Sequence, residues 1–408
     1  MKRRMLVFRS ILFAMVFLIA TSTAVMAAKT WKFQSSWPAS ILLNKPDKYF
    51  ANLIDVLAGD ELNLKYYDGG SLVKSTEVFD AVANGVVEMA TDWPSYWDGK
   101  NTAFSLLTSV PMGFSPTDYM IWYWQGGGFE LAQDLYGKYG IVWFPHGLTS
   151  PESGQRSNKQ IKTLADYKGV KMRQCGRVQA NMLGDVGGSA IFMPGGEVYM
   201  ALQRGTIDAG EFSVPEVDWV MGFQEITKYW VLPGWHQPGP LWGVMINKKS
   251  WDSLSDMTKF KFKEAAMATM MWSWTYYEYG SGDYTNKFLE AGTKISRLDD
   301  QVLEKLQQAS WKYMIEDAEK NPDFAKIAYS QVAFLEKMKF WREIQSPFTY
   351  GRTPSGLDDA YKQLEAIAKK HGVLDSANAI AKSTQERQQA EKFWVPGTKY
   401  ISNPAPVK

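Results

Sequence analysis

The sequence contains a single cysteine, Cys175, and only three histidines, His146, His236 and His371. One cysteine cannot form an internal disulfide, so the fold must be held together by packing alone. With 45% hydrophobic residues in 408, the chain can bury a sizeable core. A cysteine nucleophile needs a neighbouring histidine, and the three histidines are scattered. We therefore expect Cys175 to be a small buried side chain without a catalytic role.

Several motifs of enzyme, metal and nucleotide chemistry are also missing from the sequence. There is no HExxH, no CxxC and no EF-hand loop, so no pattern supports a metal bound by histidine. The glycines at 187–188 and 195–196 do not complete a dinucleotide-binding GxGxxG, and those at 126–128 are not followed by the lysine of a phosphate loop. A Ser/His/Asp triad cannot be placed, because no GxSxG elbow occurs.

Charge of one sign is not in excess, because 45 basic residues face 43 acidic ones, a net charge of +2. Four basic residues lie at the very start: Lys2, Arg3, Arg4 and Arg9. Without them the chain carries a net charge of about −2. No dense cluster of Lys and Arg interleaved with aromatic residues is present, which excludes a nucleic-acid surface.

Residues 1–27 have the pattern of a secretory signal peptide. The basic start is followed by an apolar run at 11–20 and by small residues at the cleavage position Val25-Met26-Ala27. The apolar run is short for a membrane span, which needs about 20 residues, so an uncleaved anchor is the weaker alternative. We expect the chain to be exported and residues 1–27 to be removed.

The remaining ~380 residues are long enough for two domains. Strands and helices alternate through the first part, with strands expected at 31–36, 63–67 and 86–91 and helices at 47–58 and 76–85. The same alternation restarts with strands at 141–144, 171–173 and 206–212. Such alternation is typical of parallel α/β layers, so we predict two α/β lobes with a cleft between them.

From about residue 256 the sequence becomes helical. Helices are expected at 257–279, 302–321, 324–341, 357–371 and 377–393. The last of them places the apolar Ala379, Ile380 and Ala390 opposite a polar face. Contact with a second copy of the chain and packing on its own chain remain equally open for this helix.

Glu211 is the first candidate for a functional side chain. It follows a short helix with Val198, Ala201 and Leu202 on one face, and it lies where the next strand ends. In open α/β sheets, ligands bind beyond the carboxyl ends of strands. The alternative is a structural carboxylate paired with a lysine or a helix end.

Arg173 is the second candidate, at the end of the strand expected over 171–173. A guanidinium there could receive a carboxylate in a bidentate manner, although a surface arginine fits equally well. Glu152 lies in a Ser-Pro-Glu-Ser-Gly loop, where a glutamate is usually solvated. Aromatic residues beside Pro and Gly at 93–97 and 233–236 are typical of loops that line clefts.

Three segments carry a family likeness: MPGGE at 193–197, ALQRGTIDAGE at 201–211 and PGWHQPG within 229–239. With them the chain resembles the solute-binding subunits of tripartite ATP-independent periplasmic (TRAP) transporters. The nearer branch binds 2-oxo acids, lactate and similar acids. The likeness covers most of residues 30–350 and is most specific at 193–239.

The resemblance implies a two-domain periplasmic binding protein (type II-like) of α/β class with crossing strands and a long connecting helix. Domain I would comprise 28–146 and about 238–280, and domain II 147–237 and about 281–350, as the resemblance suggests. Residues 351–408 would form a helical C-terminal extension. The implied function is periplasmic capture of a small organic carboxylate for a membrane permease, without catalysis. Some members of this branch are dimers.

The resemblance also implies roles for individual residues. Arg173 would bind the ligand carboxylate, and Glu211 with the carbonyl of Phe212 would bind a cation that also contacts the ligand. Phe212 replaces the usual tryptophan, and Glu152 replaces a usual glutamine ligand. The pocket would be shaped by Tyr96, Trp97, Trp235 and His236.

Two glutamates in a closed cleft would repel each other, and a bound cation removes that cost. Oxygen ligands that include two carboxylates favour Ca²⁺ over Na⁺. The alternative function is a periplasmic carbohydrate-active enzyme, with Glu152 and Glu211 as acid and nucleophile. Arg173 and the resemblance at 193–239 speak against it.

Overall fold

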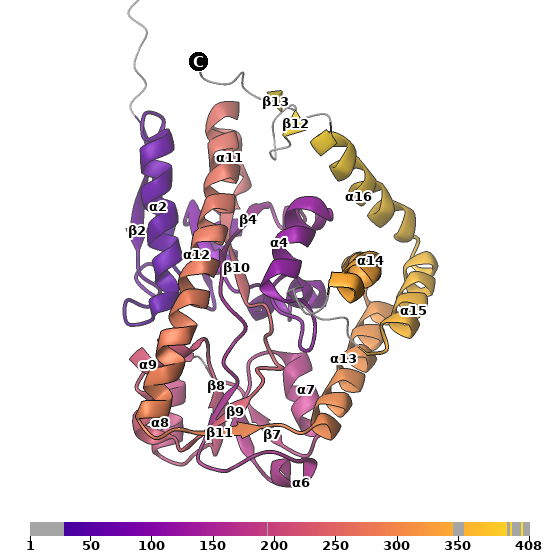
Figure 1. Ribbon diagram of the computed structural model, residues 1–408. Coiled ribbons are helices and arrows are strands. Elements are labelled where there is room, and N and C mark those ends of the chain that lie inside the picture. The colour runs from indigo at the N-terminus through magenta and orange to yellow at the C-terminus, as the bar shows by residue number, and fades with distance from the viewer. Residues whose placement is uncertain (1–27, 194, 346–354, 390–391, 394–400, 403–408) are drawn as a thin grey trace, which may run out of the picture.

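The computed structural model describes residues 28–193, 195–345, 355–389, 392–393 and 401–402. The predicted signal peptide lies outside these residues. Two β-sheets, one above the other in Figure 1, organise the chain, and a long helix runs past both. Among the described residues, no helix combines the length and apolar character needed to cross a membrane.

The first sheet has the order β2-β1-β3-β10-β4. Its strands are β1 (Lys29–Gln34), β2 (Leu62–Tyr67), β3 (Met89–Asp92), β4 (Ile141–Leu148) and β10 (Leu241–Asn247). The helical elements of this part are η1 (Leu42–Asn44), α2 (Lys45–Ala58), α3 (Val78–Ala83), η2 (Pro94–Trp97), η3 (Thr102–Leu107), α4 (Pro116–Gln125), α5 (Gly128–Gly137) and α11 (Lys248–Asp252). Strand β3 starts later than expected, because the N–H groups of Val86 and Val87 bond back to the carbonyl of Ala81.

The second sheet has the order β11-β9-β5-β8-β6-β7. Its strands are β5 (Gln155–Ser157), β6 (Lys171–Arg173), β7 (Ser189–Ile191), β8 (Ala209–Glu211), β9 (Tyr229–Leu232) and β11 (Lys294–Arg297). The helical elements are α6 (Leu164–Tyr167), α7 (Arg177–Asp185), η4 (Gly195–Glu197), α8 (Val198–Gln203), α9 (Pro215–Val220) and α10 (Phe223–Ile226). Strand β8 starts at Ala209, because the N–H groups of Thr206 and Ile207 still close the end of α8 on Ala201.

Both sheets are mixed, whereas the strand–helix alternation predicted parallel layers. Strand β10 is antiparallel to β3 and β4, and β5 is antiparallel to β8 and β9. The physical reason is that the chain crosses from one sheet to the other after β4 and again after β9. The first strands after the crossings, β5 and β10, therefore run opposite to the neighbouring strands of the sheet that they join.

The two crossing segments, 149–154 and 233–240, run side by side. The N–H of Thr149 donates to the carbonyl of Pro240 at 3.1 Å, and the N–H of Glu152 donates to the carbonyl of Gln237 at 3.0 Å. Helix α12 (Asp256–Glu290) is the third connection and contacts α2 and β4 of the first part and α9 of the second. Its 35 residues make it about 52 Å long. It continues well past the predicted end at residue 279.

Buried apolar side chains join the two parts. Trp37 and Trp93 from the first part form one cluster with Leu202 and Phe212 from the second. Larger separate cores lie under each sheet. The predicted two-domain α/β architecture is confirmed, and the parts lie packed together. The exact domain boundaries stay predictions.

The helical C-terminal region is present as predicted. It consists of α13 (Asp300–Lys320), α14 (Pro322–Gln345), α15 (Leu357–Lys370) and α16 (Leu374–Gln389), followed by the short strands β12 (Lys392–Phe393) and β13 (Ile401–Ser402). Helix α16 packs on α14, α15, α5 and α4 of its own chain, one of the two alternatives left open. Ile380 is half-buried and Ala379 is exposed, while Ala390 lies outside the described residues.

Candidate functional site

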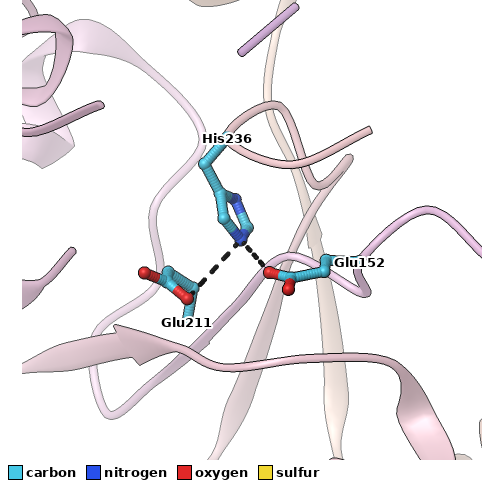
Figure 2. Close-up of side chains that lie close together, drawn as sticks. All are labelled: Glu152, Glu211 and His236. Atoms are coloured by element: carbon cyan, nitrogen blue, oxygen red, sulfur yellow. Dashed lines mark hydrogen bonds and ion pairs between the residues drawn. The ribbon is translucent and has the colours of Figure 1, made fainter. Parts of the chain in front are cut away.

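The candidate site lies where the crossing segments pass the ends of two strands of the second sheet. Glu152 comes from the first crossing and His236 from the second, while Arg173 ends β6 and Glu211 ends β8. Figure 2 shows Glu152, Glu211 and His236 pointing toward one another. The structure therefore brings together four of the residues that the sequence singled out, from four separate segments.

Two glycines allow the backbone to come this close. A Cβ atom on Gly234 would lie 2.0 Å from the carbonyl oxygen of Glu152. A Cβ atom on Gly154 would lie 2.1 Å from the carbonyl oxygen of Val231, and the φ of Gly154 is +110°. A side chain at Gly234 would push the two crossing segments apart, and one at Gly154 would push the first of them away from β9. The placement of Glu152 beside His236 thus depends on glycine.

The two glutamates and the histidine form one buried cluster. Their ligand atoms all lie within 4.8 Å of one another. His236 Nε2 lies 2.8 Å from Glu152 Oε2 and 3.9 Å from Glu211 Oε2. Exposure is 5% for Glu152 and 0% for the other two, so the cluster is shielded from solvent.

Burial changes the acidity of all three groups. It raises the pKa of Glu152 well above its usual value, and the charges of Glu211 and Asp218 raise it further, against the effect of Arg173. It also raises the pKa of Glu211, although Arg173 and the N–H of Cys175 oppose the shift. Burial and then Arg173 lower the pKa of His236 to about 3. Without a cation, these shifts favour a neutral histidine beside a protonated Glu152.

Arg173 is joined directly to Glu211. Its Nη1 donates to Glu211 Oε2 at 2.7 Å and to the Glu211 carbonyl at 3.0 Å, and its Nε donates to the carbonyl of Met193 at 3.2 Å. The parallel register of β6 and β8 pairs Arg173 with Gly210 and so places the guanidinium beside the next residue, Glu211. Burial alone would lower the pKa of Arg173, but Glu211 together with Cys175, Tyr96 and Glu152 more than offsets this, so the guanidinium stays charged.

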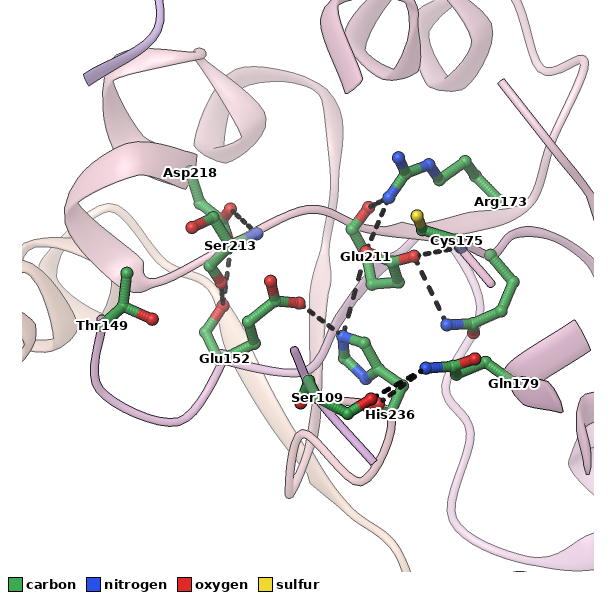
Figure 3. A network of polar contacts seen from close by, with 12 residues as sticks. Ser109, Thr149, Glu152, Arg173, Cys175, Gln179, Glu211, Ser213, Asp218 and His236 are labelled. Carbon is green, nitrogen blue, oxygen red and sulfur yellow. Dashed lines mark hydrogen bonds and ion pairs between the residues drawn. The ribbon is translucent and has the colours of Figure 1, made fainter. Parts of the chain in front are cut away.

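Two neighbours of Arg173 also hold Glu211. The N–H of Cys175 donates to Glu211 Oε1 at 2.5 Å, and Gln174 Nε2 donates to the same oxygen at 3.3 Å. Burial raises the pKa of the Cys175 thiol to about 12, so the thiol stays protonated. Figure 3 shows Arg173 and Cys175 beside Glu211.

The predicted aromatic residues fall into two groups. Trp235 packs edge-to-face on His236, with ring centroids 5.8 Å apart. Tyr96 is half-buried and packs against the apolar cluster that contains Phe212, and burial raises the pKa of its phenol. Trp97 instead lies in the core of the first sheet, where its Nε1 donates to Asp92 at 3.0 Å.

Phe212 is buried between the two parts of the molecule. A Cβ atom on Gly195 would come within 1.9 Å of its ring, so the MPGGE segment packs directly on this side chain. The phenyl ring thus fixes the backbone that follows β8. Its carbonyl is the group that the family resemblance assigns to the cation.

The sequence did not predict three contributions to the site, those of His236, Gln174 and Asp218. No motif indicated that His236 would join the two carboxylates, and neither Gln174 nor Asp218 was singled out. Gln237 Oε1 is buried and has no hydrogen-bond partner among the described residues. The available signal was position: Gln174 follows a predicted strand end, and Gln237 belongs to the PGWHQPG segment.

The cluster fits a single hard cation. Ligand atoms about 2.4 Å from a Ca²⁺ ion lie no more than about 4.8 Å apart, as those of this cluster do. Carboxylates are among the ligands that hard cations prefer, and Glu152 and Glu211 offer them in this cluster. The buried amide oxygen of Gln237 is a further group of the same kind.

Comparison with known proteins gives a consistent assignment. Residues 33–321 match the family described as bacterial extracellular solute-binding protein, family 7 (DctP). A monocarboxylate 2-oxoacid-binding periplasmic protein of Nostoc sp. is 29% identical over 77% of this chain and 86% of its own length.

Solved structures are similar over nearly their whole length. A TRAP transporter solute-binding protein from Bordetella bronchiseptica, with copurified calcium and picolinate, has a TM-score of 0.74 and 29% identity over 84% of this chain and 99% of its own. A TRAP solute-binding protein from Pseudoalteromonas atlantica, with bound sodium and pyruvate, has a TM-score of 0.70. It is 29% identical over 78% of this chain and 97% of its own.

Proposed function

The chain belongs to family 7 of the bacterial extracellular solute-binding proteins, the receptors of TRAP transporters, and we propose that its ligand is a small monocarboxylate of the 2-oxo acid type. The observation that supports this ligand is the buried ion pair of Arg173 and Glu211 at the crossing of the two parts. An arginine enclosed with a cation site offers two positive partners to one carboxylate.

The ligand would bind between Arg173 and the cation. Both carboxylate oxygens of a 2-oxo acid and its neighbouring carbonyl are hard ligands, which suit a cation held by Glu152, Glu211 and the Phe212 carbonyl. Tyr96, Trp235 and His236 would enclose the small organic part. Trp97 would act indirectly, through the core that supports Tyr96.

We favour Ca²⁺ over Na⁺ as the cation. Relatives with solved structures hold calcium or sodium, so both ions suit the fold. In this chain, Glu152 adds a second carboxylate beside Glu211, and two buried negative charges are better balanced by a divalent ion.

No catalytic step is part of the proposal. Binding requires only closure over the ligand and its desolvation, and every group of the site can serve that purpose. The carbohydrate-active alternative would need one glutamate free to attack a sugar, whereas Glu211 is held by Arg173, Gln174 and Cys175. The family match over residues 33–321 also speaks against it.

The proposal includes the place of action and the partners. Residues 1–27 would be cleaved on export, so the mature receptor would begin at Ala28 and act in the periplasm, delivering its ligand to the membrane permease. We place the contact of a homodimer on the C-terminal helices α15 and α16, which lie after Ser355. Analytical ultracentrifugation of the intact protein and of a truncation at Ser355 tests the dimer, which a monomeric intact protein would contradict.

The decisive experiment is ligand titration with controlled metal content. We expect pyruvate to bind tightly when Ca²⁺ is present, to bind more weakly after exhaustive chelation, and to raise the melting temperature without being consumed. A neutral sugar of similar or larger size serves as the control and should bind in neither condition. Stabilisation by sugars but not by acids would overturn the proposed function.

A further inference from the structure

A second buried ion pair lies directly behind the candidate cation site. Arg156 on β5 donates through Nε to Asp218 Oδ2 on α9 at 2.9 Å, and both side chains are 0% exposed. The guanidinium of Arg156 lies over the rings of Trp230, at 4.1 Å, and Phe288, at 3.8 Å. Phe288 belongs to α12, so this pair links the second sheet to the long connecting helix.

Asp218 bonds to both loops that carry candidate cation ligands. Its Oδ2 accepts a hydrogen bond from Ser153 Oγ at 2.7 Å, and Ser153 directly follows Glu152. Its Oδ1 accepts from the N–H of Ser213 at 3.1 Å, and Ser213 directly follows Phe212. Figure 3 shows Asp218 above Ser213 and the Glu152 loop. One carboxylate thus contacts the residue after each ligand.

The two loops are also tied to each other at the same residues. The N–H of Ser153 donates to the carbonyl of Ser213 at 3.0 Å. Arg156 Nη2 donates to Ser153 Oγ at 3.3 Å, and the indole of Trp230 donates to the Ser153 carbonyl. Ser153 is therefore held from four directions, and the separation of Glu152 from the Phe212 carbonyl is set by this network.

Asp218 also acts on the site through its charge. Its carboxylate accepts hydrogen bonds from Ser153 and Ser213, so its negative charge lies next to the residue that follows each loop ligand. Arg156 balances this charge through the ion pair at 2.9 Å. In a buried environment such charges interact strongly, because little solvent screens them.

We propose that Asp218, whose charge is balanced by Arg156, is a positioning residue for the cation site. Asp218 holds Glu152 and the Phe212 carbonyl at the separation that one ion requires, and it makes the site more favourable for a cation. The inference rests on the proposed function, because it presupposes that the two loops bind a cation. It goes beyond that function by assigning a role to a residue that touches neither ligand nor metal.

Asp218→Asn and Ser153→Ala test the two parts of this role separately. Asp218→Asn keeps the shape and removes the charge, whereas Ser153→Ala keeps the charge and removes the hydroxyl that bonds to Asp218 and to the Ser213 carbonyl. Loss of such a partner of the ligands typically weakens metal binding about 10- to 100-fold. We expect a loss in this range for Asp218→Asn and a smaller loss for Ser153→Ala, measured by calorimetry with Ca²⁺.

The matched control is Asp118→Asn on α4. Asp118 is equally buried, accepts from the N–H and Oγ of Ser115 at 2.9 and 2.8 Å, and pairs with Arg342, but it belongs to the first part of the molecule. Its substitution should lower the melting temperature of the metal-free protein as much as Asp218→Asn does. The Ca²⁺ affinity of Asp118→Asn should stay within about twofold of that of the parent protein.

A spectroscopic readout separates positioning from general destabilisation. Terbium(III) replaces Ca²⁺, and its luminescence lifetimes in H₂O and D₂O report how many water molecules coordinate the ion. If Ser153→Ala releases a protein ligand, the bound Tb³⁺ should gain water, and in Asp118→Asn it should not. If Asp218→Asn does not fold, Ser153→Ala still decides the question.

The outcomes distinguish this inference from the proposed function. If the parent protein binds neither Ca²⁺ nor Na⁺, the cation site itself is refuted. If the parent binds Ca²⁺ and both Asp218→Asn and Ser153→Ala bind it with unchanged affinity and unchanged hydration, Asp218 is only a structural residue and the inference is overturned.

Discussion

Arg173 Nη1 lies 2.7 Å from Glu211 Oε2, and both side chains are withdrawn from solvent. The arginine expected to bind the ligand and the glutamate expected to bind the cation are therefore in direct contact. A ligand carboxylate that contacts both Arg173 and the cation must bind next to both members of this pair. Ligand and cation binding are then linked, and each must change the affinity of the other by the same factor.

Substitution of Arg173 by glutamine should abolish tight binding of carboxylate ligands. Removal of one partner of a buried charge pair costs about 2–5 kcal/mol, which corresponds to a loss of roughly 30- to several-thousand-fold in affinity. Calorimetry with pyruvate on the folded variant measures the loss. The control is the exposed Arg204→Gln on the same lobe, whose affinity should not change. Equal affinity of both variants would show that Arg173 does not bind the ligand.

Glu211→Gln should weaken cation and ligand binding together, because it removes charge while it keeps most of the shape. The change also disturbs the bond to Arg173, so both partners of the ligand are affected. Calorimetry with Ca²⁺ alone, with pyruvate alone and with both gives the linkage. Glu197→Gln, an exposed glutamate on the preceding segment, is the control. A variant that loses only one of the two affinities would contradict the shared site.

Lys45 and Glu216 form a contact between the two parts of the molecule, 3.5 Å apart, and Tyr276 bonds to both. Lys45 starts α2 of the first part, and Glu216 lies on α9 of the second. Glu216→Gln should weaken the closed form without touching the site. Because the side chain of Lys45 is 37% exposed and solvent weakens the pair, we expect an effect of only about 0.5–1 kcal/mol, or two- to fivefold in ligand affinity.

Small-angle scattering provides the structural measurement for this closure. The radius of gyration should fall when ligand is added to the parent protein, and the ligand-free Glu216→Gln variant should be the more expanded of the two. Asp68→Asn, which breaks the Lys48–Asp68 pair within the first part, is the matched control. A radius that does not respond to saturating ligand would argue against hinge closure.

Asp92 should give the protein a pH-dependent stability below neutrality. Burial raises its pKa to about 6, although hydrogen bonds from Tyr136, Trp143 and Trp97 oppose the shift. In the unfolded chain the pKa of this carboxyl is about 4. Between about pH 4 and pH 6 the folded protein therefore keeps a proton on Asp92 that the unfolded chain has released. The stability from this carboxyl is complete below about pH 4 and is lost as the pH rises to about 6, by about 3 kcal/mol.

Urea unfolding of the parent protein and of Asp92→Asn at several pH values isolates this contribution. The difference in unfolding free energy, parent minus variant, should fall between pH 4 and pH 6 and stay constant above. Asp60→Asn, at an exposed position of the same part of the molecule, is the control and should leave the difference flat. A flat difference curve for Asp92→Asn would place the pKa of this carboxyl near its usual value.

Local sequence patterns predicted most of the elements that build the site. The strand that ends at Arg173, the strand that ends at Glu211 and the short helix before it follow from apolar spacing over a few residues, which depends on local chemistry. Errors occurred at element ends, such as the later starts of β3 and β8, where the backbone bonds back to the preceding helix. The burial of the single cysteine was also readable from the composition.

The sequence by itself determined which side chains were available: two glutamates, one arginine and the glycines that permit close backbone contact. Tertiary structure alone decided their partners. The contact of Arg173 with Glu211 depends on the register of β6 and β8, and that of Glu152 with His236 depends on two crossing segments more than eighty residues apart. The role of Asp218 likewise arises from bonds to loops distant in sequence. Such contacts leave no local period or motif, because they are set by how the sheets and connections pack and not by neighbouring residues.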